Sequence, residues 1–103
     1  MKLIDPRKFQ PVQPWAALDI ARINGATVRL HWTDQPYRWH INDGNEVFVV
    51  IDGEVEMHYR EAGEEKVVVI KPGEIFCAGE GDEHFANPIG AARVLVIERE
   101  GSI

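Results

Sequence analysis

The residues whose types could bind a metal ion are two histidines and a glutamate. His40 closes one short predicted strand and Glu46 opens the next, so the Asn42–Asn45 turn between them brings their side chains close together. The strand that Glu46 opens is otherwise apolar, and a carboxylate there must be solvated, paired or bound to a cation. Two imidazoles and one carboxylate are the composition of a metal site with open coordination positions. The second histidine is His84, and whether it meets His40 and Glu46 depends on the fold.

The remaining histidines are predicted to lie on polar faces. His58 alternates with Glu56 and Arg60, which places it on a solvated face. His31 shares a face with Arg29. In a one-sided sheet that face meets water, whereas in a barrel it can line the pocket, so both residues are candidate substrate contacts.

Composition limits the class of protein. The chain has 103 residues, enough for one domain, and a net charge of −6, which disfavours nucleic acid and anionic membranes as partners. We expect a cytoplasmic protein, because no signal peptide and no apolar run long enough to span a membrane is present. The single cysteine, Cys77, is expected to be a small buried apolar residue.

The hydrophobic pattern predicts an all-β domain. Residues 1–14 contain three prolines and are predicted to be an extended arm, with a helical turn near residues 5–9, while residues 15–103 form a single domain. Alternation and turn residues predict about nine short strands, typical of a sandwich or barrel. They cover residues 15–23, 26–33, 37–41, 46–51, 54–60, 66–70, 74–78, 83–86 and 92–99. Asn24-Gly25 and Asp52-Gly53 are the predicted hairpin turns.

The apolar pattern of the central predicted strand indicates that the protein associates with a second copy of itself. Val47, Val49 and Ile51 point away from Phe48 and Val50, so both faces of residues 46–51 are apolar. Open strand edges also need a cover. We therefore expect a homodimer.

The spacing of these residues resembles the two motifs of the cupin superfamily. His40-x-Asn42-x-x-x-Glu46, six residues and Gly53 is similar to the first motif, in which a second histidine stands where this chain has Asn42. Gly73, five residues, Gly79-Glu80-Gly81, two residues and His84 is similar to the second motif, with Gly79 where proline is usual. The resemblance covers residues 15 to 99 and implies a jelly-roll barrel of two antiparallel sheets.

The resemblance also implies a metal centre. His40, Glu46 and His84 correspond to ligands of one divalent ion (zinc, iron, manganese, nickel or cobalt), and Asn42 is a weak fourth ligand or a hydrogen-bond donor to a substrate. The catalytic residues are not identified. The candidates for the wall of the pocket are His31, Trp32, Phe48, Val50, Tyr59 and Phe76.

Two functions of different classes fit this sequence. In the first, the metal acts on a small polar metabolite in an isomerisation, epimerisation or oxygenation. In the second, the barrel binds a small ligand or sugar without catalysis or acts as a sensor. The amide of Asn42 favours this alternative, because it is a weaker metal ligand than imidazole. Whether the protein is an enzyme stays open, because one fold hosts many chemistries.

Overall fold

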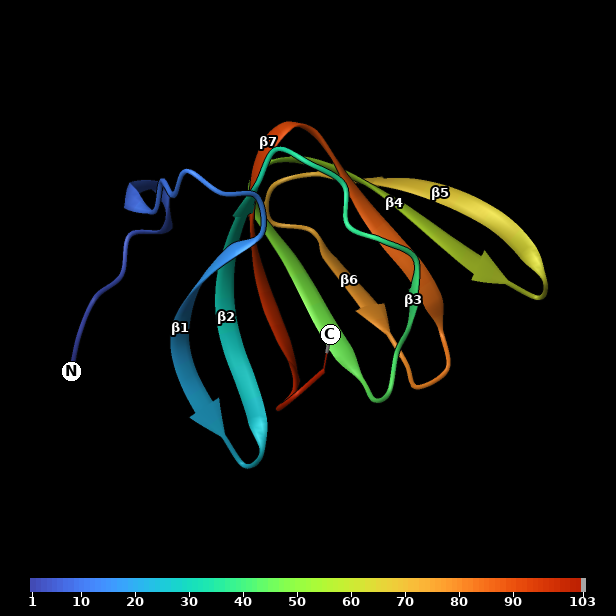
Figure 1. Ribbon diagram of the computed structural model, residues 1–103, viewed down its shortest axis with the longest axis horizontal. Coiled ribbons are helices and arrows are strands. Elements are labelled where there is room, and N and C mark those ends of the chain that lie inside the picture. The colour runs from blue at the N-terminus through green and yellow to red at the C-terminus, as the bar shows by residue number, and fades with distance from the viewer. Residues whose placement is uncertain (103) are drawn as a thin grey trace.

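A computed structural model, which describes residues 1–102, shows a jelly-roll barrel of two antiparallel sheets (Figure 1). Among these residues no helix has the length and apolar character to cross a membrane. The elements are η1 (Pro6–Lys8), β1 (Ala16–Ile23), β2 (Ala26–Thr33), β3 (His40–Ile41), β4 (Glu46–Glu61), β5 (Glu64–Ile70), β6 (Ile75–Ala78) and β7 (Glu83–Arg99). The predicted all-β fold class is confirmed.

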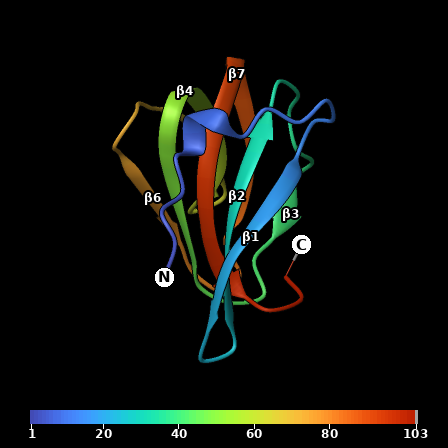
Figure 2. The same ribbon diagram turned by 90° about the vertical axis from the view of Figure 1, so that its left-hand side faces the viewer.

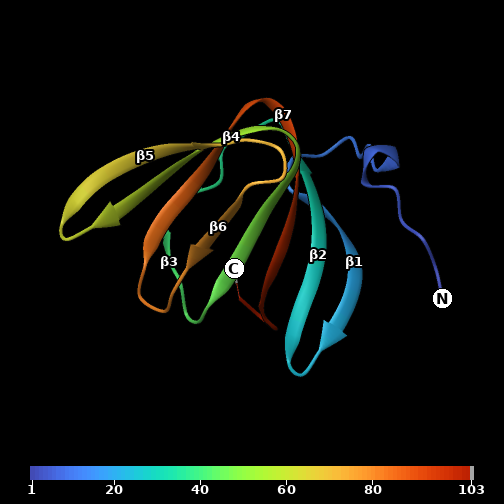
Figure 3. The same cartoon turned by 180° about the vertical axis from the view of Figure 1, so that it is seen from behind.

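The two longest strands, β4 and β7, belong to both sheets. The first sheet has the order β1-β2-β7-β4-β6, and it uses the first part of β4 and the last part of β7. The second has the order β3-β7-β4-β5, and it uses the other parts of the same two strands. Figures 1 and 3 show that β5 and the end of β4 extend as a ribbon beyond the rest of the barrel.

The predicted hairpin at Asp52-Gly53 is wrong. Both residues lie inside β4, where the pairing with β7 shifts register between Val50 and Glu54 and the strand bends from one sheet into the other. The predicted break at residues 87–91 is wrong for the same reason, because β7 runs through it without interruption. Turn residues therefore mark bulges here, and a bulge bends a strand without ending it.

Local signals elsewhere gave the right elements. Asn24 and Gly25 both have positive φ and join β1 to β2, as the hairpin signal predicted. Asp5 caps the short helix η1, its carboxylate accepting a hydrogen bond from the backbone N–H of Arg7. The arm before β1 contacts the barrel where Arg93 donates a hydrogen bond to the carbonyl of Phe9.

The core lies between the two sheets and is built from inward-facing residues of the two long strands. Buried residues of β4 and β7 pack together with one residue of β5, and they are Phe48, Val50, Val55, Met57, Ile70, Ala86, Ala92, Val94 and Val96. Because β4 and β7 cross both sheets, this core holds the two sheets in a fixed relation. That relation fixes the position of every side chain that faces inward.

The bend in β4 predicts that two glycines differ sharply in how well they tolerate substitution by alanine. A Cβ at Gly53 (φ +74°) would lie 2.3 Å from the carbonyl oxygen of Ala91, whereas a Cβ at Gly63 (φ +80°) meets nothing within 4 Å. We expect Gly53→Ala to lower the free energy of unfolding by about 3 kcal/mol or more, because backbone must move. Gly63→Ala should cost about 1 kcal/mol for its positive φ alone. Urea denaturation of the two variants checks this, and equal losses would contradict the clash.

Candidate metal centre

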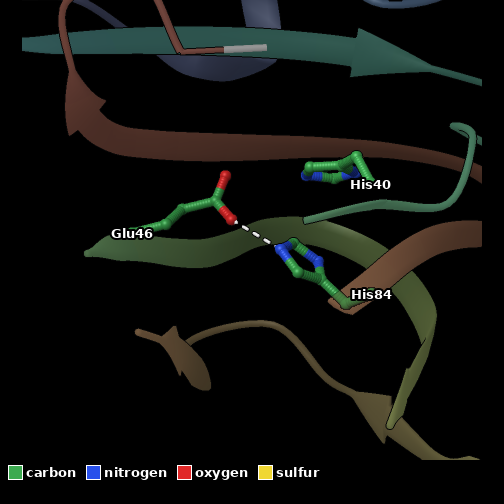
Figure 4. Close-up of side chains that lie close together, drawn as sticks. All are labelled: His40, Glu46 and His84. Atoms are coloured by element: carbon green, nitrogen blue, oxygen red, sulfur yellow. Dashed lines mark ion pairs between the residues drawn. The ribbon is translucent and has the colours of Figure 1, made fainter. Parts of the chain in front are cut away.

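The two histidines and the glutamate of the candidate site lie together inside the barrel. His40 and His84 are direct cross-strand partners in β3 and β7, and their ring centroids are 4.4 Å apart. Glu46 is the first residue of β4 and approaches from the other sheet (Figure 4). One possible donor atom of each residue lies within 4.8 Å of the others. The juxtaposition of His84 with His40 and Glu46, which the sequence alone left undecided, is therefore present.

Two backbone hydrogen bonds hold the loops that carry these residues. The N–H of Asn42 donates to the carbonyl of Asp82, and the N–H of Gly81 donates to the carbonyl of Asn42. These bonds join the turn after β3 to the glycine-rich loop before β7. The loops next to His40 and His84 are therefore fixed relative to each other.

Asn42 and Glu46 converge on a single nitrogen of His84. Nε2 of His84 lies 2.8 Å from Oδ1 of Asn42 and 3.0 Å from Oε1 of Glu46. Both oxygens are acceptors, so Nε2 carries a proton and donates a hydrogen bond to Oδ1 of Asn42. Glu46 and His84 are only 7% and 3% exposed, which keeps water from competing for these contacts.

Three buried polar atoms in this cluster have no hydrogen-bond partner among the described residues: Nδ2 of Asn42, Oε1 of Glu46 and Nδ1 of His84. Such atoms are uncommon and costly in proteins. A cation can be the partner of the Glu46 oxygen and of an unprotonated Nδ1 of His84, whereas Nδ2 of Asn42 is a hydrogen-bond donor and needs an acceptor. Imidazole and carboxylate donors suit a divalent transition metal. The residues present therefore fit a metal ion.

The protonation states also suit metal binding. Burial lowers the pKa of His40, so its ring is neutral near pH 7, and its Nδ1 is hydrogen-bonded to the carbonyl of Arg38. That bond leaves Nε2 as the nitrogen available to an ion. Burial alone would raise the pKa of Glu46, but contact with His84 outweighs it and the pKa lies below its usual value. Glu46 is therefore an anion.

A cavity of about 250 Å³ opens next to the candidate site. Of the residues predicted to line it, His31 and Phe48 do so. His31 contacts the ring of Trp15, with centroids 5.9 Å apart, and burial lowers the pKa of this histidine. Arg29, also considered from the sequence, lines the cavity and pairs with Asp19 at 2.8 Å.

The other predicted wall residues lie outside this cavity. Trp32 is on the opposite face of β2 from His31, because successive side chains of a strand alternate. Val50 is fully buried in the core. Tyr59 and Phe76 line a separate hollow beside β6, which shares only His84 with the cavity.

Two of the remaining histidine and cysteine predictions need correction. His58 is not on an open solvated face, because its ring stacks on Phe85 with centroids 4.3 Å apart and its side chain is 18% exposed. Cys77 is exposed and not buried, since it lies on the outer side of β6. Alternation could not show either fact, because both depend on what packs over the strand.

Sequence reasoning missed Glu98, which lines the cavity and is the cross-strand partner of Glu46. Burial and the Glu46 carboxylate raise the pKa of Glu98 to about 7. A signal was available, because Glu98 continues the inward-facing series of Val94 and Val96. Trp15 and Tyr37 also line the cavity, but they lie in loops where no periodicity marks them.

Comparison with solved structures identifies the fold. No family model matches the chain. A cupin-2 domain protein from Shewanella frigidimarina has 25% sequence identity and a TM-score of 0.76, over 85% of this chain and 83% of that one. Hydroquinone 1,2-dioxygenase from Sphingomonas superposes with a TM-score of 0.75 at 18% identity, over 86% of this chain and 28% of that one.

Sequence comparison finds a further similarity. The 3-hydroxyanthranilate 3,4-dioxygenase of Bos taurus is 42% identical over 65 residues, which are 59% of this chain and 21% of the bovine protein. The human enzyme is 37% identical over the same length. This match therefore spans about a fifth of those curated relatives. Together with the two-sheet barrel, the structural similarities show that the chain has the cupin fold.

The carboxylate pair predicts a pH dependence of stability. The pKa of Glu98 in the folded protein, about 7, lies above its value near 4.5 in an unfolded chain. The folded state therefore holds a proton more tightly, and stability falls as pH rises from about 4.5 to 7. Glu98→Gln should remove this loss. Urea titrations of both metal-free proteins at pH 5 and pH 8 measure it, and an unchanged pH difference in the variant would contradict the assignment.

Proposed function

We propose that His40, Glu46 and His84 hold one divalent transition metal ion, and that the ion acts on a small polar metabolite in the adjoining cavity. The observation that supports this most is that possible ligand atoms of His40, Glu46 and His84 lie within 4.8 Å of one another, with Glu46 and His84 buried. Solved structures with this fold include one described as containing Fe(II) and one described as containing Fe³⁺, which makes iron a first choice of metal.

Of the reactions considered from the sequence, we favour oxygenation. The curated relatives that match this chain are dioxygenases, and so are two of the structural neighbours. A metal ion with open positions can bind substrate oxygens and activate dioxygen. Three protein ligands leave such positions open.

The residues of the chain itself would position the substrate. Phe48, Met57 and Val96 form an apolar floor, and Trp15 and Tyr37 stand edge to face with ring centroids 5.1 Å apart. Such walls fit a flat, aromatic or unsaturated molecule and exclude water. His31 and Arg29 line the same cavity and can donate hydrogen bonds to substrate oxygens.

Asn42 supports the alternative of a non-catalytic ligand-binding barrel. Its amide oxygen is a weak metal ligand, and in this structure it accepts a hydrogen bond from His84. We assign it the role of orienting the His84 ring. The alternative predicts that a ligand binds whether or not metal is present.

Elemental analysis is the first test of the metal centre. We expect close to one metal ion per chain after loading with Fe(II). His84→Ala should lose that ion, because the two ligands that remain, His40 and Glu46, bind it weakly. The matched control is His58→Ala, since His58 is a partly buried histidine outside the cluster. Equal metal content in all three proteins would contradict the site.

Oxygen uptake tests the reaction. Fe(II)-loaded protein should consume dioxygen with some member of a panel of aminophenols, catechols and hydroquinones, and His84→Ala should lose the activity at least a hundredfold. His58→Ala should retain it. Absence of uptake, together with a substrate-induced rise in melting temperature in metal-free protein, would favour the non-catalytic alternative.

A further inference from the structure

One arginine lines the inside of the barrel beside the candidate metal centre. Arg29 lies on the same face of β2 as His31, because the two are separated by one residue of the strand, and both line the cavity. Among the described residues, Arg29 is the only lysine or arginine of the cavity wall. Its guanidinium is protonated at any physiological pH. The cavity therefore contains one permanent positive charge.

The guanidinium of Arg29 has donors that the protein does not use. Its Nε donates a hydrogen bond of 2.8 Å to Oδ1 of Asp19, the cross-strand partner of Arg29 in β1. The two terminal amino groups, Nη1 and Nη2, have no hydrogen-bond partner within residues 1–102. They form a fork that matches the two oxygens of a carboxylate. The side chain of Asp19 is 80% exposed, so water screens its charge while it holds the fork in place.

Arg29 and the candidate ligand Glu46 lie at different ends of the cavity. The strand register places Arg29 opposite Val96, and Val96 opposite Phe48, which follows Glu46 by two residues. Strand spacings of about 4.8 Å and a rise of about 3.4 Å per residue then separate the Cα atoms of Arg29 and Glu46 by roughly 12 Å. A ligand that spans the cavity meets the metal ligands at one end, apolar side chains in the middle and the guanidinium at the other end.

A second hollow continues the cavity past Arg29. The two hollows share Arg29, Glu98 and Ser102, and the outer one extends to Arg22. Figure 2 shows β1 and β2 side by side, and the chain after β7 turning back toward β3, where Ser102 donates a hydrogen bond to Asp43. Arg29 therefore lies at the neck between the inner cavity and the outer hollow, and a ligand that enters on this side passes its guanidinium.

We propose that the metabolite is a carboxylic acid and that Arg29 binds its carboxylate, which makes Arg29 the residue that selects the substrate. The proposal rests on the function proposed above. A divalent ion beside Glu46 leaves one positive charge, Arg29 adds a second, and Glu98 can cancel only one of them. An anionic ligand balances the remainder. The cavity of about 250 Å³ limits that ligand to about one ring.

A phosphate ester fits this charge pattern less well. Phosphate groups carry close to two negative charges at pH 7, and proteins usually bind them with several cations or with a helix N-terminus. The inner cavity offers the single fork of Arg29. The nearest further arginine of the two hollows, Arg22, lies in the outer one and is paired with Glu100 at 3.5 Å. One fork beside the carboxyl group of Glu98 suits a monoanion.

Binding of two matched probes tests the proposal. The probes are 3-hydroxybenzoate and its neutral amide, 3-hydroxybenzamide, which share a shape and differ in charge. Isothermal titration calorimetry on Zn(II)-loaded protein should give a dissociation constant at least about tenfold lower for the acid than for the amide. Arg29→Gln should abolish this preference, and Arg29→Lys should restore only part of it, because lysine has the charge without the fork. Arg22→Gln is the matched control and should keep the full preference.

Each contrary result has a definite meaning. Equal affinity of the native protein for acid and amide would overturn the proposal, and so would failure to bind either probe at about 10 mM. A preference that survives Arg29→Gln would also overturn it, because the ion and not the arginine would then bind the carboxylate. Loss of the preference in Arg22→Gln to the same extent as in Arg29→Gln would show a general effect of charge. Phenyl phosphate should bind more weakly than 3-hydroxybenzoate, and tighter binding would overturn the choice of a carboxylate.

Zinc content, measured on the same samples, separates this test from that of the metal centre. If the protein holds no zinc, the metal centre fails, and the comparison is made on metal-free protein. Arg29→Gln should there weaken binding of 3-hydroxybenzoate about tenfold and leave that of the amide unchanged, because the fork acts without the ion. Equal binding of the acid by both proteins would overturn the role of Arg29. Circular dichroism checks that every variant is folded.

Discussion

The convergence of Asn42 and Glu46 on the buried Nε2 of His84 is the constraint on which the rest of the site depends. A buried carboxylate is costly unless it is paired, and here its partner is an imidazole supplied by the other sheet. The same imidazole is the cross-strand partner of His40, since β3 and β7 pair at this position. The barrel thus brings together four residues that lie up to 44 positions apart in the chain.

The same two strands build both the core and the cavity. Inward side chains of β4 and β7 such as Val50 and Val94 pack in the core, and others such as Phe48 and Val96 also line the cavity. The shape of the cavity is therefore set by the same packing that holds the two sheets together.

The structural neighbours identify the fold, and the cavity bears on the reaction. The structural neighbours show a cupin fold, whereas the choice of oxygenation rests on relatives that match over about a fifth of their own length. The cavity adds chemical detail that neither comparison supplies, since aromatic walls and a pair of carboxylates, Glu46 and Glu98, surround the donors. Those carboxylates lie next to each other, and a cation would relieve their repulsion.

The sequence by itself determined the all-β class, most strand positions and the candidate ligands. Alternation along 26–33 and positive-φ turn residues at Asn24-Gly25 are local signals, and local backbone preferences are enough to produce them. Only the tertiary structure decided that β4 and β7 continue through their bulges, that His84 meets Glu46, and that Glu98 faces the cavity. Each of these depends on register between strands far apart in the chain, which no local signal encodes.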